Sequence, residues 1–198
     1  YALADDVTDI NTTTPERHKS ALMAAAAAGD ALLVKRLLTL GADPLMRNNN
    51  HGTALMYACW GGDTATAAQL LTTRTTLNAQ SSNGWTALMM CATKNRGRIT
   101  RMLLDQNVDP NIADVYGWTP LMRAAYEGCL DALSVLLQAP AIDTAHENHQ
   151  GQTALHLAAI GKRKAAYLML LAHGMDGDKL DKLGNSPTSI ARTQGLIH

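Results

Sequence analysis

The chain of 198 residues contains no phenylalanine, and tryptophan and tyrosine together make up only 4% of it. Large aromatic side chains therefore cannot supply most of a core, although 46% of the residues are hydrophobic. No apolar run approaches the length of about 20 residues that a membrane-spanning helix needs. The sequence thus predicts no membrane insertion and a core of small and aliphatic side chains, chiefly Ala, Leu and Met.

A net charge of one sign is also missing. Lys and Arg number 17, as do Asp and Glu, so the formal charge at pH 7 is zero. This balance does not favour a nucleic-acid partner, and we expect none. The three cysteines show neither a disulfide framework nor the spacing of a metal site, which favours a reducing compartment and predicts a cytoplasmic protein without a cofactor.

One pattern returns six times along the chain, and the stretch from Gly117 to Gly128, GWTPLMRAAYEG, contains it in full. Aligned on their first Ser or Thr, the copies are 33, 33, 33, 34 and 33 residues apart. They begin at Ser20, Thr53, Thr86, Thr119, Thr153 and Ser186. A constant period of this length predicts stacked repeats.

Each unit has the pattern of two short helices and a turn. The starting Ser or Thr can accept a hydrogen bond from the first turn of a new helix, and Pro120 and Pro187 follow it where a missing N–H costs nothing. A second helix then carries an apolar stripe, such as Leu133 with Leu136 and Leu137. Residues that tolerate positive φ are expected to end the helices: Gly29, Gly62 and Gly128 the first helices, and Gly41, Asn107 and Gly174 the second.

With Thr-Pro-Leu-Met at Thr119 and Thr-Ala-Leu-His-Leu-Ala-Ala at Thr153, the unit resembles the ankyrin repeat, whose signature is Thr-Pro-Leu-His-x-Ala. The resemblance covers about residues 18 to 198. It implies an all-α solenoid of stacked helix-turn-helix units with protruding β-turn or hairpin tips. Only His156 keeps the histidine of the family, as a partner of its own helix N-terminus.

Methionine replaces that histidine in four units, at Met23, Met56, Met89 and Met122. We expect this column to pack inside the stack, with an adaptable binding surface as the alternative. Cys59 and Cys91 occupy small positions of first helices and are predicted to be core residues. Cys129 falls in the loop between two helices and is expected to be more accessible.

The register divides the chain into repeats at about residues 18–50, 51–83, 84–116, 117–150 and 151–183, with a polar half-repeat at 184–198 that caps the stack. Residues 1–17 are either a leader or the remnant of a preceding repeat, because Asp9-Ile10-Asn11 resembles Asp109-Pro110-Asn111. The chain starts at Tyr1 instead of Met, which is compatible with a segment upstream. The second repeat is expected to be the weakest, since its second helix is rich in Thr and the stretch Thr72–Thr76 supplies no Gly stop.

Catalytic motifs are missing where they would have to be. Gly161-Lys162 lacks the flanking residues of a phosphate loop, and His146 and His149 are three apart instead of the four of a zinc-protease helix. We therefore expect no enzyme. The resemblance implies a monomeric module that binds another protein through a concave groove and the turn tips. An inhibitor, immunity-type or effector protein that blocks or captures one target is the alternative, and the repeat region of a larger enzyme is a third reading.

Aromatic residues give the strongest evidence for a site. Trp60 and Tyr126 share a position near the end of first helices where other units hold Ala27, Thr93 and Ile160, so packing does not require a ring there. Trp85 and Trp118 recur just before a starting Thr, where stacking between turns is the alternative to binding. The predicted partner-binding residues are Trp60, Tyr126, Arg123, Trp85, Trp118, Tyr116, Tyr57 and Glu127.

Charges are also sorted by register. Acidic residues such as Asp43, Asp109 and Asp143 fall in or beside the turns, while basic residues such as Lys94, Arg96 and Arg98 fall on the helices or the loops between them. If the turns face the partner, this sorting predicts a partner with a basic patch.

Overall fold

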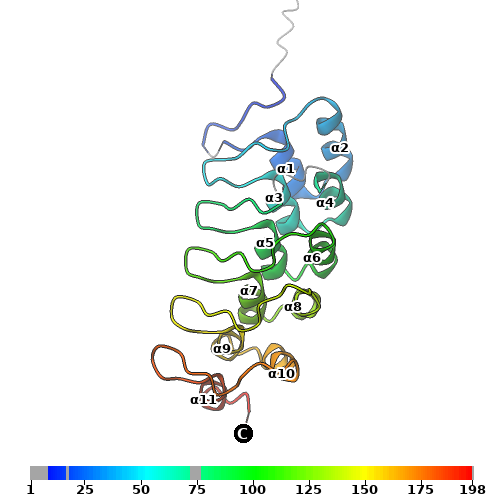
Figure 1. Ribbon diagram of the computed structural model, residues 1–198. Coiled ribbons are helices and arrows are strands. Elements are labelled where there is room, and N and C mark those ends of the chain that lie inside the picture. Colours follow the sequence, from blue (N-terminus) through cyan, green and yellow to red (C-terminus); the bar gives the residue numbers. More distant parts are fainter. Residues whose placement is uncertain (1–8, 17, 72–76, 198) are drawn as a thin grey trace, which may run out of the picture.

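The computed structural model describes residues 9–16, 18–71 and 77–197, and these residues form eleven helices and no strand (Figure 1). The first helices of successive units are α1 (Ala21–Ala28), α3 (Ala54–Gly61), α5 (Ala87–Thr93), α7 (Pro120–Glu127), α9 (Ala154–Ile160) and α11 (Pro187–Thr193). The second helices are α2 (Ala31–Thr39), α4 (Thr64–Leu70), α6 (Gly97–Leu104), α8 (Leu130–Leu137) and α10 (Lys164–Ala172).

The helices are arranged in two rows. Each first helix contacts the first helix of the next unit, from α1 through α11, and the second helices contact one another in the same order from α2 to α10. The turns between units project to one side as a row of fingers (Figure 1). The predicted all-α solenoid of helix-turn-helix units is therefore confirmed.

Every first helix begins where the sequence predicts. Ser20, Thr53, Thr86 and Thr119 accept a hydrogen bond from the backbone N–H three residues on, at 3.3, 3.3, 3.2 and 3.4 Å, and Ser186 does so at 3.1 Å. Gly29, Gly62 and Gly128 end their helices in the left-handed region, at φ of 70°, 93° and 74°. Capping therefore fixes both ends of α1, α3 and α7.

His156 links two units. Its Nδ1 accepts from the backbone N–H of Thr153 at 3.1 Å, which leaves the hydrogen on Nε2, 3.2 Å from the carbonyl oxygen of Asn185 in the next unit. The ring is fully buried, and this burial lowers the pKa of His156, which favours the neutral ring that both contacts need. The predicted role as partner of its own helix N-terminus is confirmed.

The interior is built from small and flexible side chains. Met23, Met56, Met89 and Met122 are at most 3% exposed, so they are core residues. Cys59 and Cys91 are fully buried, as predicted. Cys129 is 9% exposed and is thus the most accessible of the three, as expected. Its thiol still lies against the preceding unit, where Sγ donates to the carbonyl oxygen of Thr93 at 3.4 Å. Burial also raises the pKa of this thiol.

Backbone hydrogen bonds join the tips of the turns into one edge. The N–H of Ser82 donates to Asn50 O at 2.9 Å, and the same bond recurs from Val115 to Asn83, from His149 to Tyr116 and from Lys182 to Gln150, at 3.2, 3.2 and 2.9 Å. Gly117 in one tip has a φ of 78°, and a Cβ there would lie 3.0 Å from the backbone nitrogen of His149. Glycine thus allows both the turn and the close approach.

A residue before the first helix makes a hydrogen bond that recurs between later turns. Asn11 Oδ1 accepts from the N–H of Asp43 at 2.8 Å, as Asn78 accepts from Asp109 at 3.1 Å and Asn111 from Asp143 at 2.8 Å. The repeat boundaries, including the reading of residues 1–17, stay a prediction, and residues 1–8 and 17 lie outside the described residues. The stretch Thr72–Thr76, which was expected to lack a glycine that ends the helix, also lies outside the described residues.

Removal of one cap tests the register. Thr119→Ala should lower the free energy of unfolding by about 1 kcal/mol, because the first turn of α7 loses its acceptor. Ser82→Ala, which removes an exposed hydroxyl in a tip, is the matched control. Equal denaturant midpoints for the two variants would contradict the capping role.

Local stability should be lowest in the second unit. α4 buries Thr66, Ala67 and Leu70, whereas α8 buries Ala132, Leu133 and Leu136. We expect amide hydrogen exchange to be faster in α4 than in α8, since a solenoid opens where the repeat and its interfaces are weakest. Equal protection in the two helices would refute this expectation.

Candidate functional site

The exposed side of the first helices and the neighbouring tips form one surface, which we name the groove face. It carries most of the aromatic residues that the sequence predicts as a site. Its members are Tyr57 and Trp60 on α3, Met90 on α5, Arg123 and Tyr126 on α7, and Trp85 and Trp118 in the turns.

Arg123, on α7, lies between two tryptophans of this face. Its guanidinium carbon is 4.5 Å from the ring centroid of Trp85 and 4.5 Å from that of Trp118. The guanidinium thus stacks on one ring from its own unit's turn and on one from the preceding turn. Each cation–π contact of this kind contributes about 0.5 to 2 kcal/mol, so Arg123 holds both rings in place.

Asp114 in turn holds Arg123. The two side chains form an ion pair, with 18% of the Arg123 side chain and none of the Asp114 side chain exposed. Asp114 Oδ1 also accepts from the backbone N–H groups of Tyr116 at 2.9 Å and Trp118 at 3.0 Å. One carboxylate therefore closes the tip and orients the arginine, and a buried charge of this kind needs such partners.

Tyr126 extends the row of rings. Its ring meets that of Trp118 edge to face, with centroids 5.3 Å apart and an interplanar angle of 68°. Both rings remain accessible: Trp118 is half-buried, and Tyr126 is 36% exposed. The predicted neighbours Arg123, Trp85, Trp118 and Tyr126 are thus joined by direct contacts.

Two lysines cover rings at the other end of the groove face. Lys94 Nζ lies 3.7 Å from the ring centroid of Trp60, and Lys19 Nζ lies 4.4 Å from that of Tyr57. Trp60 is nevertheless 46% exposed. Asn48 fixes Tyr57 by donating from Nδ2 to its hydroxyl at 2.8 Å.

A hollow of about 380 Å³ separates these two rings from Trp85. Met56 and Met90 line it together with the three rings, and Asn50 and Asn83 line it from two successive tips. The volume is within the range of about 300 to 1,000 Å³ found for ligand pockets. The hollow is large enough to accept a side chain of a partner.

The remaining two predicted residues lie apart from this hollow. Tyr116 is 60% exposed at a tip, where its backbone bonds both Asp114 and His149. Glu127, at the end of α7, forms an ion pair of 4.0 Å with Arg163 of the next unit. Neither residue lines the hollow.

Sequence reasoning missed Asp114, Lys19 and Lys94 as members of the site. Asp114 had a signal, because Asn48, Ser81, Asn148 and Asp181 occupy the same register and also accept hydrogen bonds from their tips. No local pattern indicated the two lysines. Lys19 lies over Tyr57 and Lys94 over Trp60, which are 38 and 34 positions away in neighbouring units.

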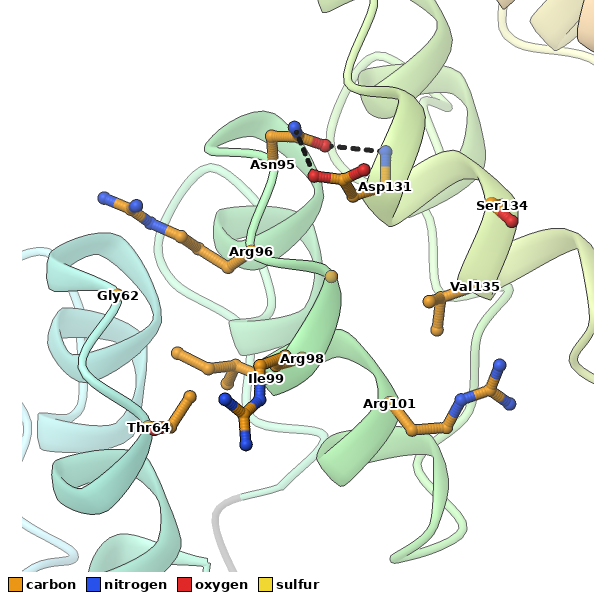
Figure 2. Close-up of a pocket in the computed structure, with 11 residues that line it drawn as sticks. Gly62, Thr64, Asn95, Arg96, Arg98, Ile99, Arg101, Asp131, Ser134 and Val135 are labelled. Carbon is orange, nitrogen blue, oxygen red and sulfur yellow. Dashed lines mark hydrogen bonds between the residues drawn. The ribbon is translucent and has the colours of Figure 1, made fainter.

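A second hollow, of about 560 Å³, lies among the second helices (Figure 2). Arg96, Arg98 and Arg101 line it, and opposite them Asn95 donates to Asp131 at 3.1 Å. The three guanidinium groups point in different directions (Figure 2). Arg96 is tied to the Gly61 carbonyl at 3.1 Å, and Arg101 donates to Gln138. None of the predicted site residues lines this hollow.

No helix in the described part of the chain has the length and the continuous apolar character that a membrane-spanning segment requires. Within the same residues, no group of three or more His, Cys, Asp or Glu side chains is placed to hold a metal ion.

A comparison with curated proteins finds no similar sequence. The family model described as ankyrin repeats (3 copies) matches residues 2–80 and 62–148, which together are more than half of the chain. Ankyrin repeats are generic protein–protein interaction modules and are typically not catalytic. The match agrees with the capped helix pairs, the 33-residue period and the row of tips: the chain belongs to the ankyrin repeat family.

Proposed function

We propose that this protein binds a partner protein through the groove face, with Trp60 and Tyr126 as the main anchors. The observation that carries the proposal is the exposure of two large rings at a position where other units hold small or aliphatic residues. Exposed Trp, Tyr and Arg are the residues that most often dominate binding energy. Packing of the stack does not require these rings, because first helices that hold Ala27, Thr93 or Ile160 at this position also contact their neighbours.

The contacts around the rings support this role. Arg123 between Trp85 and Trp118, and Lys94 on Trp60, restrict side chains that a partner would otherwise have to order. Ordering an interface side chain costs about 0.5 to 1.5 kcal/mol. A face that is already ordered binds with less loss of entropy. Arg123 is therefore assigned to positioning the rings more than to touching the partner.

The other predicted features belong to the same proposal. Tyr116 and Glu127 would contact the partner at the edge of the groove face. A monomeric state and a cytoplasmic location are also part of it. A basic patch on the partner stays a prediction for the turns, where Asp43, Asp109 and Asp143 accept hydrogen bonds from their own turns at 2.8, 2.9 and 3.0 Å. Whether the partner is one enzyme that is blocked or a protein that is held is decided by its identity.

Alanine variants test the anchors. With a partner captured by affinity purification and identified by mass spectrometry, Trp60→Ala or Tyr126→Ala should weaken binding by about 2 kcal/mol or more, measured by calorimetry. The melting temperature should stay nearly unchanged, because both rings are exposed.

Leu32→Ala is the control, since Leu32 is 83% exposed on the second-helix row. It should bind the partner as the unchanged protein does. If Trp60→Ala instead lowers the melting temperature and the folded variant binds normally, Trp60 is a packing residue and the proposed site loses its anchor.

The buried carboxylate allows a separate test. Asp114→Ala should lower the free energy of unfolding by about 3 kcal/mol or more, because it leaves Arg123 unpaired and opens the tip. Asp114→Asn keeps an acceptor for the tip and loses only the charge, so it should cost less. Equal losses for the two variants, measured by denaturant unfolding, would show that the ion pair matters and the tip bonds do not.

A further inference from the structure

The hollow at Tyr57, Trp60 and Trp85 has a marked charge asymmetry. None of its ten lining residues is Asp or Glu. The two rings on α3 each carry a lysine ammonium, from Lys19 in the preceding unit and Lys94 in the next. The ion pairs of the described residues involve neither lysine. Two of the three rings that line the hollow therefore carry a positive charge.

The third cation of the groove face differs in this respect. Arg123 already has the buried carboxylate of Asp114 as its counter-ion, so its charge is balanced within the protein. The charges available to a partner are those of Lys19 and Lys94. Both are held on ring faces, and both side chains are only half-buried.

We propose that the groove face recognises an acidic peptide segment of its partner protein. An apolar side chain of the segment enters the hollow between Tyr57, Trp60 and Trp85, and carboxylates on either side of it pair with Lys19 and Lys94. This inference rests on the proposed function and specifies the chemistry of the partner.

Cationic ligands are a poor fit for the same hollow. Three aromatic rings can form a cage for a cation, but the faces of Trp60 and Tyr57 already carry ammonium groups at 3.7 and 4.4 Å. A further positive charge would meet two like charges within a few ångströms of the rings, which is repulsive. An incoming carboxylate is instead attracted by the two ammonium groups.

The polar rim suits a peptide backbone. Asn50 and Asn83 lie at the same register of two successive tips and are both exposed, so their side-chain amides can pair with N–H and C=O groups of an extended chain. Below them Asn48 is buried and fixes the hydroxyl of Tyr57. The hollow thus has an ordered apolar floor and an adaptable polar edge.

Three synthetic peptides of equal length test this inference. In each peptide Leu alternates with one other residue, which is Glu in the first, Ser in the second and Lys in the third. Binding is followed by intrinsic fluorescence, because Trp60 and Trp85 line the hollow. We expect the Glu peptide to bind most tightly. The double variant Lys19→Glu, Lys94→Glu should weaken its binding by about tenfold or more and should improve that of the Lys peptide.

Lys35→Glu, Lys164→Glu is the matched control, since it makes the same change of net charge at exposed positions of α2 and α10. It should leave the affinity of the Glu peptide unchanged. Equal losses in both double variants, or a Glu peptide that binds no tighter than the Ser or Lys peptide, would overturn the inference. A captured partner that needs Trp60 and is indifferent to Lys19→Glu, Lys94→Glu would overturn it too, and would leave the proposed function standing.

Discussion

Close approach of successive first helices is the constraint on which the rest of this structure depends. A Cβ on Gly61 would lie 2.7 Å from the carbonyl oxygen of Ala27, and one on Gly161 would lie 2.3 Å from that of Tyr126. Neither distance leaves room for a larger residue. The alanines between the rows are buried for the same reason, and the longer aliphatic and thioether side chains fill what remains. Tyr167 is a fully buried ring among the helices, whereas the three tryptophans lie in or beside the turns and on the exposed side of a helix.

The turns convert this stacking into an ordered surface. Their backbone bonds fix each tip against the next, and the Asp114 carboxylate connects one tip to Arg123 and so to two rings. Framework and site therefore share residues at this point. A change in Asp114 affects both, whereas the ring of Trp60 is carried by α3 and covered by Lys94.

Much of the fold could be predicted because its signals are local. A Ser or Thr before each first helix, and a glycine after α1, α3 and α7, determine helix ends within a few residues, and the period supplies the order of stacking. The exposure of Trp60 and Tyr126 also followed from the register, together with the geometry that the family resemblance implies. The lysine contacts did not, since each joins residues of different units and depends on side-chain reach. Nor did the contact of the Cys129 thiol with the carbonyl group of Thr93, which also joins two units.

The edge formed by the tips has a consequence for how recognition can change. The bonds between tips use the carbonyl groups of Asn50, Asn83, Tyr116 and Gln150, and not their side chains, all of which are exposed. Different amino acids thus occupy the same position in successive tips without altering the backbone hydrogen bonds between the tips. Selection can exchange these four side chains independently of folding, so the protein can acquire a new target by substitution at its tips while its scaffold is inherited unchanged.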